Sequence, residues 1–327
     1  MGMDRNKKQV WTGRVYFSPA QTAFYIILVM LGLLGNATVI GVIGKSVIMD
    51  RGGARNSDIV IINMALSNLL VSVMRNVLLV ITDMGVKLYS SKEWCQFLMG
   101  IWVWLRSVNV WSTLLLSAFH FQTLRRVAPV IGNIHGGRGA SKTLLLSLGL
   151  VWLLNFIYSI PAHILSTNGN ENSTTTMMLV STTTRPLLGC VWNFPSSFSG
   201  LAYATTSMVI HETTPIILMA FTNLSSLYTL YTHGRKRSSV KDAPIIKRVP
   251  AERRAAKVIL ALIILFIISW GTSIISVNYF NYNRGSSAEF LLVVARFSNI
   301  IFIAMSPVVL AIGHRGLRSF IKSALVR

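Results

Sequence analysis

Charged residues are scarce in this chain, and acidic residues are the scarcest of them. Asp, Glu, Lys and Arg together make up 13% of the 327 residues, and only 10 of these are acidic. A soluble domain carries about 25% charged residues, so the composition excludes an ordinary soluble protein. Because hydrophobic residues account for 52% of the chain, we predict an integral membrane protein.

Residues that several other functions need are also missing. The chain has only two cysteines, and His120, His163 and His211 are too scattered along the sequence to group as metal ligands. The apolar segments contain neither a His-Glu-x-x-His run nor a pair of acids, so an intramembrane enzyme is not indicated. Transporters commonly show internal repeats, and the chain has none. We therefore predict no catalytic residue, no metal and no cofactor.

What the chain does have is seven apolar stretches, each long enough to cross a bilayer, which takes about 20 residues. They predict an all-α membrane protein, a seven-transmembrane-helix bundle, with helices over 20–44, 58–82, 94–124, 142–165, 199–231, 256–280 and 288–312. The chain then divides into an N-terminal tail over 1–19, a helical domain over 20–312 and a C-terminal tail over 313–327. The stretch 314–321 is amphipathic, which predicts a short helix on the membrane surface.

The basic residues between the apolar stretches predict the orientation of the bundle. The segments that follow predicted helices 1, 3 and 5, with the C-terminal tail, hold or border 20 Lys and Arg residues, whereas those that follow helices 2, 4 and 6 hold 4. Lys and Arg accumulate in cytoplasmic loops, so we predict an extracellular N-terminus, although the N-terminal tail is itself basic. The net charge of +21 then reflects topology and attraction to anionic membrane lipids rather than binding of nucleic acid.

Both cysteines fall on the predicted extracellular side. Cys95 begins the third predicted helix and Cys190 lies in the loop between the fourth and fifth. Disulfides persist outside the cell, so we predict that this pair is bonded and tethers the loop to the third helix; two unrelated cysteines are the alternative. The same loop contains Asn172, in an Asn-Ser-Thr sequence that predicts N-glycosylation.

Short motifs match rhodopsin-like G-protein-coupled receptors in part. The first two predicted helices carry Gly35-Asn36 and an Asn-Met-Ala-Leu-Ser-Asn run that ends at Asn68. The base of the third helix reads Phe-His-Phe around His120 in place of Asp-Arg-Tyr, and the seventh reads Ser-Pro-Val-Val-Leu at 306–310 in place of Asn-Pro-x-x-Tyr. With Leu-Leu-Ser-Ala-Phe at 115–119 and Ala-Pro at 128–129, the chain resembles the vomeronasal type 1 receptors and their fish counterparts, the olfactory receptor class A-related proteins.

This resemblance covers essentially the whole chain and implies a chemosensory receptor for pheromones or odorants. It further implies a multi-pass protein of the plasma membrane of chemosensory neurons that activates a heterotrimeric G protein of the inhibitory class and has no enzymatic activity. A bitter-taste-like receptor for neutral ligands is one alternative, although such receptors generally lack the external cysteine pair. A small-anion transporter is the other.

Four charged residues lie inside the apolar segments, where a charge is costly and usually functional. They are Arg75, Arg106, Glu212 and Arg296. A rise of about 1.5 Å per residue places the three arginines about 12–16 Å below the outer surface. We expect them to converge if helices 2, 3 and 7 adjoin, as the resemblance implies.

A guanidinium group matches a carboxylate, sulfate or phosphate in two hydrogen bonds, and Glu212 is the only acid that the sequence places at a similar depth. We therefore predict a small anionic ligand, such as an organic carboxylate, with Trp102 as an aromatic wall. The alternative is structural: Arg75 and Arg296 reach the outer surface, or Glu212 neutralises Arg106.

The predicted cytoplasmic side carries the candidate signalling surface. Basic residues cluster at the inner ends of helices 3, 5 and 6, where a G protein would bind. The G-protein-facing residues we predict are His120, Arg125, Arg126, Arg235, Lys236, Arg237, Arg253 and Arg254.

Overall fold

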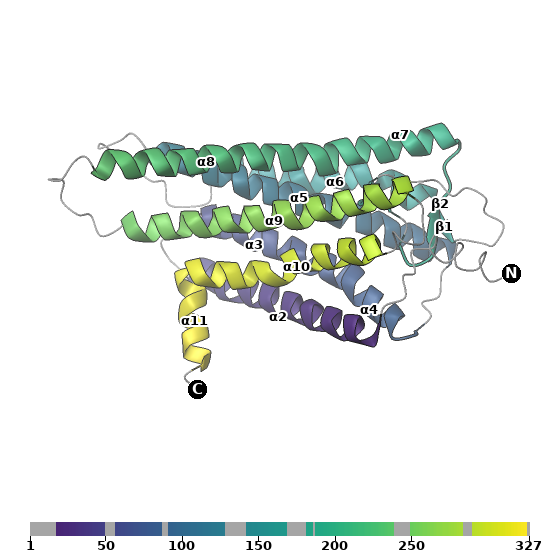
Figure 1. Cartoon of the computed structure of the whole chain (residues 1–327), viewed down its shortest axis with the longest axis horizontal. Coiled ribbons are helices and arrows are strands. Elements are labelled where there is room, and N and C mark those ends of the chain that lie inside the picture. The colour runs from purple at the N-terminus through teal and green to yellow at the C-terminus, as the bar shows by residue number, and fades with distance from the viewer. Residues whose placement is uncertain are drawn as a thin grey trace.

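The computed structural model describes residues 18–49, 56–86, 91–127, 142–168, 181–185, 187–238, 249–283 and 290–325. These residues form long helices that run side by side (Figure 1). In chain order the helical elements are α2 (Pro19–Met49), α3 (Asn56–Val71), η1 (Ser72–Val77), α4 (Leu78–Asp83), α5 (Lys92–Val127), α6 (Lys142–Leu165), α7 (Ser197–Ser207), η2 (Met208–Thr213), α8 (Thr214–Ser238), α9 (Val249–Asn283), α10 (Phe290–Gly313) and α11 (Arg315–Leu325). Two strands, β1 (Ser166–Asn168) and β2 (Cys190–Trp192), complete the described elements.

Six of the predicted membrane segments lie within a helical rod, and the seventh, 288–312, is helical from Phe290 on, its first two residues lying outside the described residues. Two of these rods contain a π-helical turn: α3, η1 and α4 follow one another without a break, as do α7, η2 and α8. Five helices are long and apolar enough to cross a membrane: Pro19–Met49, Asn56–Asp83, Lys142–Leu165, Ala256–Phe280 and Phe290–Gly313. They contain or overlap the predicted segments 20–44, 58–82, 142–165, 256–280 and 288–312.

The predicted segments 94–124 and 199–231 are helical but fall outside this apolar set. For α5 the reason is its place in the bundle, because it packs against α3, α6 and α8. A helix enclosed by protein can carry polar side chains that a lipid-facing helix cannot. Those buried on α5 are Arg106, Ser107, Asn109, Ser112, Thr113, Ser117 and His120.

The outward face of the bundle is apolar. Beyond its first residue, Lys142, the large exposed side chains of α6 are all hydrophobic: Leu145, Leu146, Leu150, Leu153, Leu154, Phe156, Ile157, Ile160 and Ile164. An apolar surface of this extent marks contact with a membrane or a partner. Together with the apolar helices, it identifies a helical membrane protein.

Close backbone packing joins α2 to α10. A Cβ atom added at Gly35 would lie 2.8 Å from Cγ of Pro307, a distance that atoms of a real side chain do not adopt. The next residue, Asn36, donates from Nδ2 to the carbonyl oxygen of Ile303 at 2.9 Å. The Gly-Asn pair therefore lets the two helices approach and satisfies a buried amide in their contact.

Neutral polar side chains link the helices at the middle of the bundle. Asn68 donates to the hydroxyl of Ser306 at 3.2 Å, and Asn109 donates to the side-chain oxygen of Asn68 at 2.7 Å. These bonds tie α3 to α10 and to α5. Buried amides are stable when they are paired in this way.

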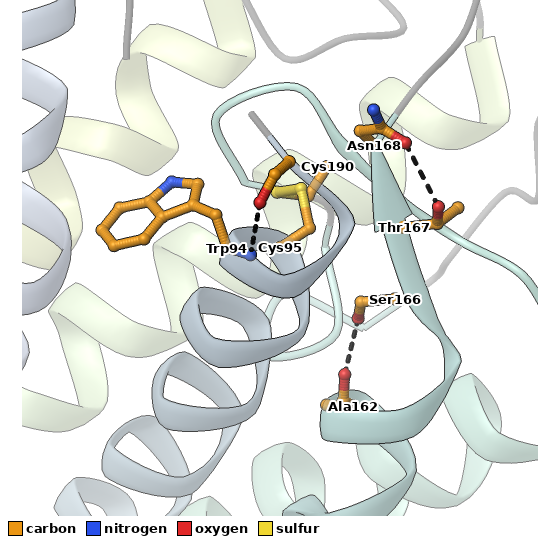
Figure 2. The surroundings of a disulfide bond; sticks show 8 residues. Trp94, Cys95, Ala162, Ser166, Thr167, Asn168 and Cys190 are labelled. Atoms are coloured by element: carbon orange, nitrogen blue, oxygen red, sulfur yellow. Dashed lines mark hydrogen bonds between the residues drawn. A yellow bond between two sulfur atoms is a disulfide. The ribbon is translucent and has the colours of Figure 1, made fainter. Parts of the chain in front are cut away.

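One end of the bundle is capped by a disulfide-bonded hairpin. Strands β1 and β2 pair antiparallel, with Asn168 opposite Cys190, and Cys190 is bonded to Cys95 at the start of α5 (Figure 2). The predicted disulfide is confirmed. Asn172, the predicted glycosylation site, lies outside the described residues.

The other end of the bundle carries α11, which turns away from α10 (Figure 1). Helix α11 covers 315–321 of the amphipathic stretch predicted over 314–321. Leu317 is buried against the bundle, whereas Phe320 and Ile321 are exposed. The helix thus keeps an apolar strip open beside its basic residues.

Candidate ligand-binding site

The four charged residues singled out in the sequence all lie in the half of the bundle nearest the hairpin. Arg75 is in η1, Arg106 in α5, Glu212 in η2 and Arg296 in α10. Arg106 is 3% exposed, Arg296 8% and Glu212 0%. Arg75 and Glu212 each occupy a π-helical turn, a feature that often marks a functional position. For η2 the cause is local, since Pro215 follows it and has no N–H to donate to the preceding turn.

Arg75 and Arg106 share one aromatic ring. The guanidinium carbon of Arg75 lies 4.9 Å from the centroid of Trp102, and that of Arg106 lies 5.7 Å from it. Trp102 is itself buried. Two of the three arginines expected to converge, Arg75 and Arg106, therefore lie within cation–π distance of the same Trp102 ring.

Among the described residues, the hydrogen-bond and ring partners of Arg106 are neutral. Its guanidinium carbon lies 3.2 Å from the ring centroid of Trp270 on α9, and its Nη2 donates to Oδ1 of Asn299 on α10. Asn299 in turn donates to Ser273 at 2.9 Å. Nε of Arg106 and Nε1 of Trp270 are buried without a hydrogen-bond partner among the described residues.

Arg296 has an acidic partner that the sequence pattern did not reveal. Both of its Nη atoms donate to the carboxylate of Asp83, at the end of α4, and its guanidinium carbon lies 4.0 Å from the Tyr25 ring. Glu212 is therefore not the only acid within reach of the arginine cluster. The long Arg296 side chain reaches the outer end of the second rod, so residue depth alone did not reveal the pair.

Glu212 is bound by the loop between α6 and α7, not by an arginine. Its Oε1 accepts hydrogen bonds from Oγ of Ser181 at 2.8 Å, Oγ1 of Thr182 at 2.7 Å and the backbone N–H of Thr183 at 2.7 Å. Arg106 is near enough to interact with Glu212 electrostatically, but no ion pair joins them. The structural alternative, in which Glu212 forms an ion pair with Arg106 and neutralises it, is therefore not observed.

Arg185 is a fourth arginine near the cluster, and the sequence pattern did not single it out. Its guanidinium carbon lies 5.9 Å from the ring of Phe280 at the end of α9. Burial and, secondarily, the positive charge of Arg75 lower the pKa of Arg185 to about 10. It stays protonated at neutral pH. The sequence feature that could have identified Arg185 is its position five residues before Cys190, because the disulfide of Cys190 holds this loop over α5.

Positive charge exceeds negative charge in this region. Among the described residues, the cluster contains four arginines and two acids, and the one ion pair found there joins Arg296 to Asp83. Arg75 and Arg106 have no carboxylate partner in the part of the chain that the structure describes. Within the same residues, no group of His, Cys, Asp and Glu could hold a metal ion.

The predicted G-protein-facing residues lie at the opposite end of the bundle. His120 is buried near the end of α5, and Arg125, one turn on, is exposed with its guanidinium carbon 5.6 Å from the Phe121 ring. The side chains of the others lie outside the described residues, although their backbones belong to α5, α8 and α9: Arg126, Arg235, Lys236, Arg237, Arg253 and Arg254.

Comparison with known proteins identifies relatives along nearly the whole chain. Residues 20–323 match the vomeronasal organ pheromone receptor family. The chain is 39% identical over 302 residues to olfactory receptor class A-like protein 4 of Danio rerio, which covers 91% of this chain and 88% of that protein. It is also 21% identical over 246 residues to neuropeptide Y receptor type 6 of Oryctolagus cuniculus, covering 75% of this chain and 63% of that one.

Proposed function

The chain belongs to the vomeronasal type 1 family of G-protein-coupled receptors, and from this premise we propose that it detects a small organic anion at Arg75 and Arg106. The resemblance inferred from the motifs is thus confirmed. Members of this family are chemosensory membrane receptors and not enzymes. The receptor assignment displaces the anion transporter as an alternative.

The observation that carries the anion proposal is the pair of guanidinium groups on Trp102. Both lie within cation–π distance of the ring, and neither has a carboxylate partner among the described residues. A charge without a partner is costly where it is buried, as at Arg106, and a guanidinium group keeps its charge at any physiological pH. A ligand carboxylate, sulfate or phosphate would supply the missing negative charge.

Unsatisfied donors point to the same ligand chemistry. Nε of Arg75, Nε of Arg106 and Nε1 of Trp270 are buried and have no hydrogen-bond partner among the described residues. All three are donors only, so they favour a ligand that is rich in acceptors. The rings of Trp102 and Trp270 would contact its apolar part.

The proposal places all seven rods across the plasma membrane of a chemosensory neuron, with the N-terminus and the hairpin outside. The oxidised Cys95–Cys190 pair supports this orientation, because disulfides persist outside the cell. Glycosylation of Asn172 would follow from it. The amphipathic α11 would then lie on the cytoplasmic membrane surface, with Arg315, Arg318 and Lys322 near anionic lipids.

Signalling would start from Arg106, which contacts α9 through Trp270 and α10 through Asn299. A ligand that binds the active arrangement of these helices more tightly shifts the receptor toward it. The inner ends of α5, α8 and α9 would then bind a heterotrimeric G protein, which the family resemblance assigns to the inhibitory class.

The test is a cell-based G-protein activation screen with carboxylic acids and their matched neutral esters and amides. Activation by the acids alone is the expected result. Equal activation by the neutral partners would overturn the anion proposal and identify a receptor for neutral ligands. A response through a stimulatory G protein, with no inhibitory coupling, would contradict the assigned G-protein class.

A further inference from the structure

Glu212 has one carboxylate oxygen that the protein satisfies and one that it leaves open. Oε1 accepts three hydrogen bonds from residues 181–183. Oε2 is buried and has no hydrogen-bond partner among the described residues, and the residue as a whole is 0% exposed. A buried carboxylate oxygen without a donor is unfavourable, so a donor from a bound molecule would be stabilising.

The helical turn that carries the open oxygen packs against the helix that carries Arg106, part of the proposed anion site. Arg106 is near enough to interact electrostatically with both Arg75 and Glu212. The turn that carries Glu212 packs directly on α5, because Nε1 of Trp111 donates to Nδ1 of the neighbouring His211 at 3.1 Å. Arg106 thus lies within electrostatic range of the cation Arg75 in η1 and of the acid Glu212 in η2.

The unsatisfied groups divide into two kinds. Arg75, Arg106 and Trp270 leave donors open, whereas Glu212 leaves an acceptor open. An organic anion with no donor of its own would satisfy only the first kind. A protonated amine has three donors and no acceptor, and it also carries the charge that a buried carboxylate requires.

We infer that the ligand is zwitterionic and of amino-acid type, with its anionic group at Arg75 and Arg106 and its ammonium group at Oε2 of Glu212. This inference rests on the proposed function and adds a second recognition contact to it. The loop then has a role in specificity, because Ser181, Thr182 and Thr183 hold Oε1 and so orient Oε2 for the ligand. The competing explanation is that Glu212 only anchors the loop.

The test uses the full-length receptor in a G-protein activation assay with probes matched on one carbon skeleton. One set is phenylalanine, hydrocinnamate, phenethylamine and methyl hydrocinnamate. A second is leucine, isocaproate, isoamylamine and methyl isocaproate, and γ-aminobutyrate with butyrate adds a longer separation of charges. In at least one set the amino acid should be about tenfold or more as potent as its deaminated acid, the effect of one charged hydrogen bond.

Two variants separate recognition from anchoring, each checked for surface expression. Glu212→Gln should remove the potency advantage of the amino acid and leave the deaminated acid unchanged. The Ser181→Ala/Thr182→Val double variant removes two donors to Oε1 but keeps the carboxylate, so it should reduce the advantage less than Glu212→Gln does. Should Glu212→Gln fail to reach the surface, Glu212→Asp, which shortens the carboxylate arm, should reduce the advantage selectively.

The failures are distinguishable. If acids surpass neutral esters but no amino acid surpasses its deaminated acid in the wild type, the zwitterion inference is wrong and the proposed function stands. If Glu212→Gln weakens the amino acid and the deaminated acid equally, Glu212 is only an anchor. If the neutral esters match the acids, the proposed function fails as well.

Discussion

Arg296 and Asp83 form an ion pair that joins α10 to the outer end of α4, so Arg296, unlike Arg75 and Arg106, has a carboxylate partner among the described residues. The pair accounts for one of the two acids near the cluster, and the loop between α6 and α7 binds the other, Glu212. The two arginines at Trp102 consequently have no carboxylate partner among the described residues. Substitution of individual residues can separate these roles.

Replacing Arg106 should weaken the response to anions more than replacing an exposed cation. We expect Arg106→Gln to lower the potency of an acidic agonist at least about tenfold, because it removes a charged hydrogen-bond donor from a buried position. Lys92→Gln is the matched control, since Lys92 is basic, exposed and at the same end of α5. Dose–response curves at equal surface expression measure both. Equal losses in the two variants would indicate general electrostatic attraction rather than a site.

Breaking the Arg296–Asp83 pair should destabilise the receptor. Asp83→Asn leaves Arg296 without its carboxylate, which costs about 3–5 kcal/mol when a pair is fully buried. The loss should be smaller here because the Asp83 side chain is 15% exposed. Thermal unfolding of the detergent-solubilised receptor measures the change. The Asp83→Asn/Arg296→Gln double variant should recover part of the stability; a further drop would show that the two residues act independently.

Removing the disulfide should release the loop that binds Glu212. Cys95 and Cys190 are 95 residues apart in sequence, and loss of a native disulfide typically costs about 2–5 kcal/mol. We expect Cys95→Ser, Cys190→Ser and the double variant to lose similar amounts of surface expression, because each removes the same bond. Additive losses in the double variant would argue against the pairing. A mobility shift on reduction provides a second check.

Adding a methyl group to α2 should lower the stability of the receptor at Gly35, which contacts α10, but not at Gly41, which faces open space. Gly35→Ala would place a methyl group 2.8 Å from Pro307, and overpacking of this kind costs about 1–3 kcal/mol. Gly41→Ala on the same helix meets nothing within 4 Å and should be neutral or slightly stabilising, as alanine favours helix. Thermal stability of both variants tests this; an unchanged Gly35→Ala protein would show that the helices can separate without cost.

Much of the fold could be predicted because its signals are local. The apolar stretches predict helices, since each spans a bilayer length without needing a distant partner. The cysteine pair was predictable because topology placed both residues on one side. Helix α5 was also predicted from the sequence. The burial of its polar side chains was not, because that burial depends on the neighbouring helices that enclose α5.

The site could be predicted only in part. Arg75, Arg106 and Trp102 were found because charge and aromaticity are conspicuous in apolar segments. Asn299 and Arg185 were missed, since a neutral amide in a helix and a basic residue in a loop are both unremarkable in sequence. The contact of Asp83 with Arg296 was missed because depth along a helix does not specify which side chains meet across helices.

The amino-acid sequence by itself therefore determined the class of protein, the helical segments, the disulfide and the presence of buried charge. Each of these follows from composition or from the local pattern of apolar residues, without knowledge of distant contacts. Only the tertiary structure decided how that charge is distributed. Helix rotation and packing assigned Asp83 to Arg296, the loop hydroxyls to Glu212, and Trp102 to both Arg75 and Arg106. Those pairings depend on distances between residues far apart in sequence, which no local pattern encodes.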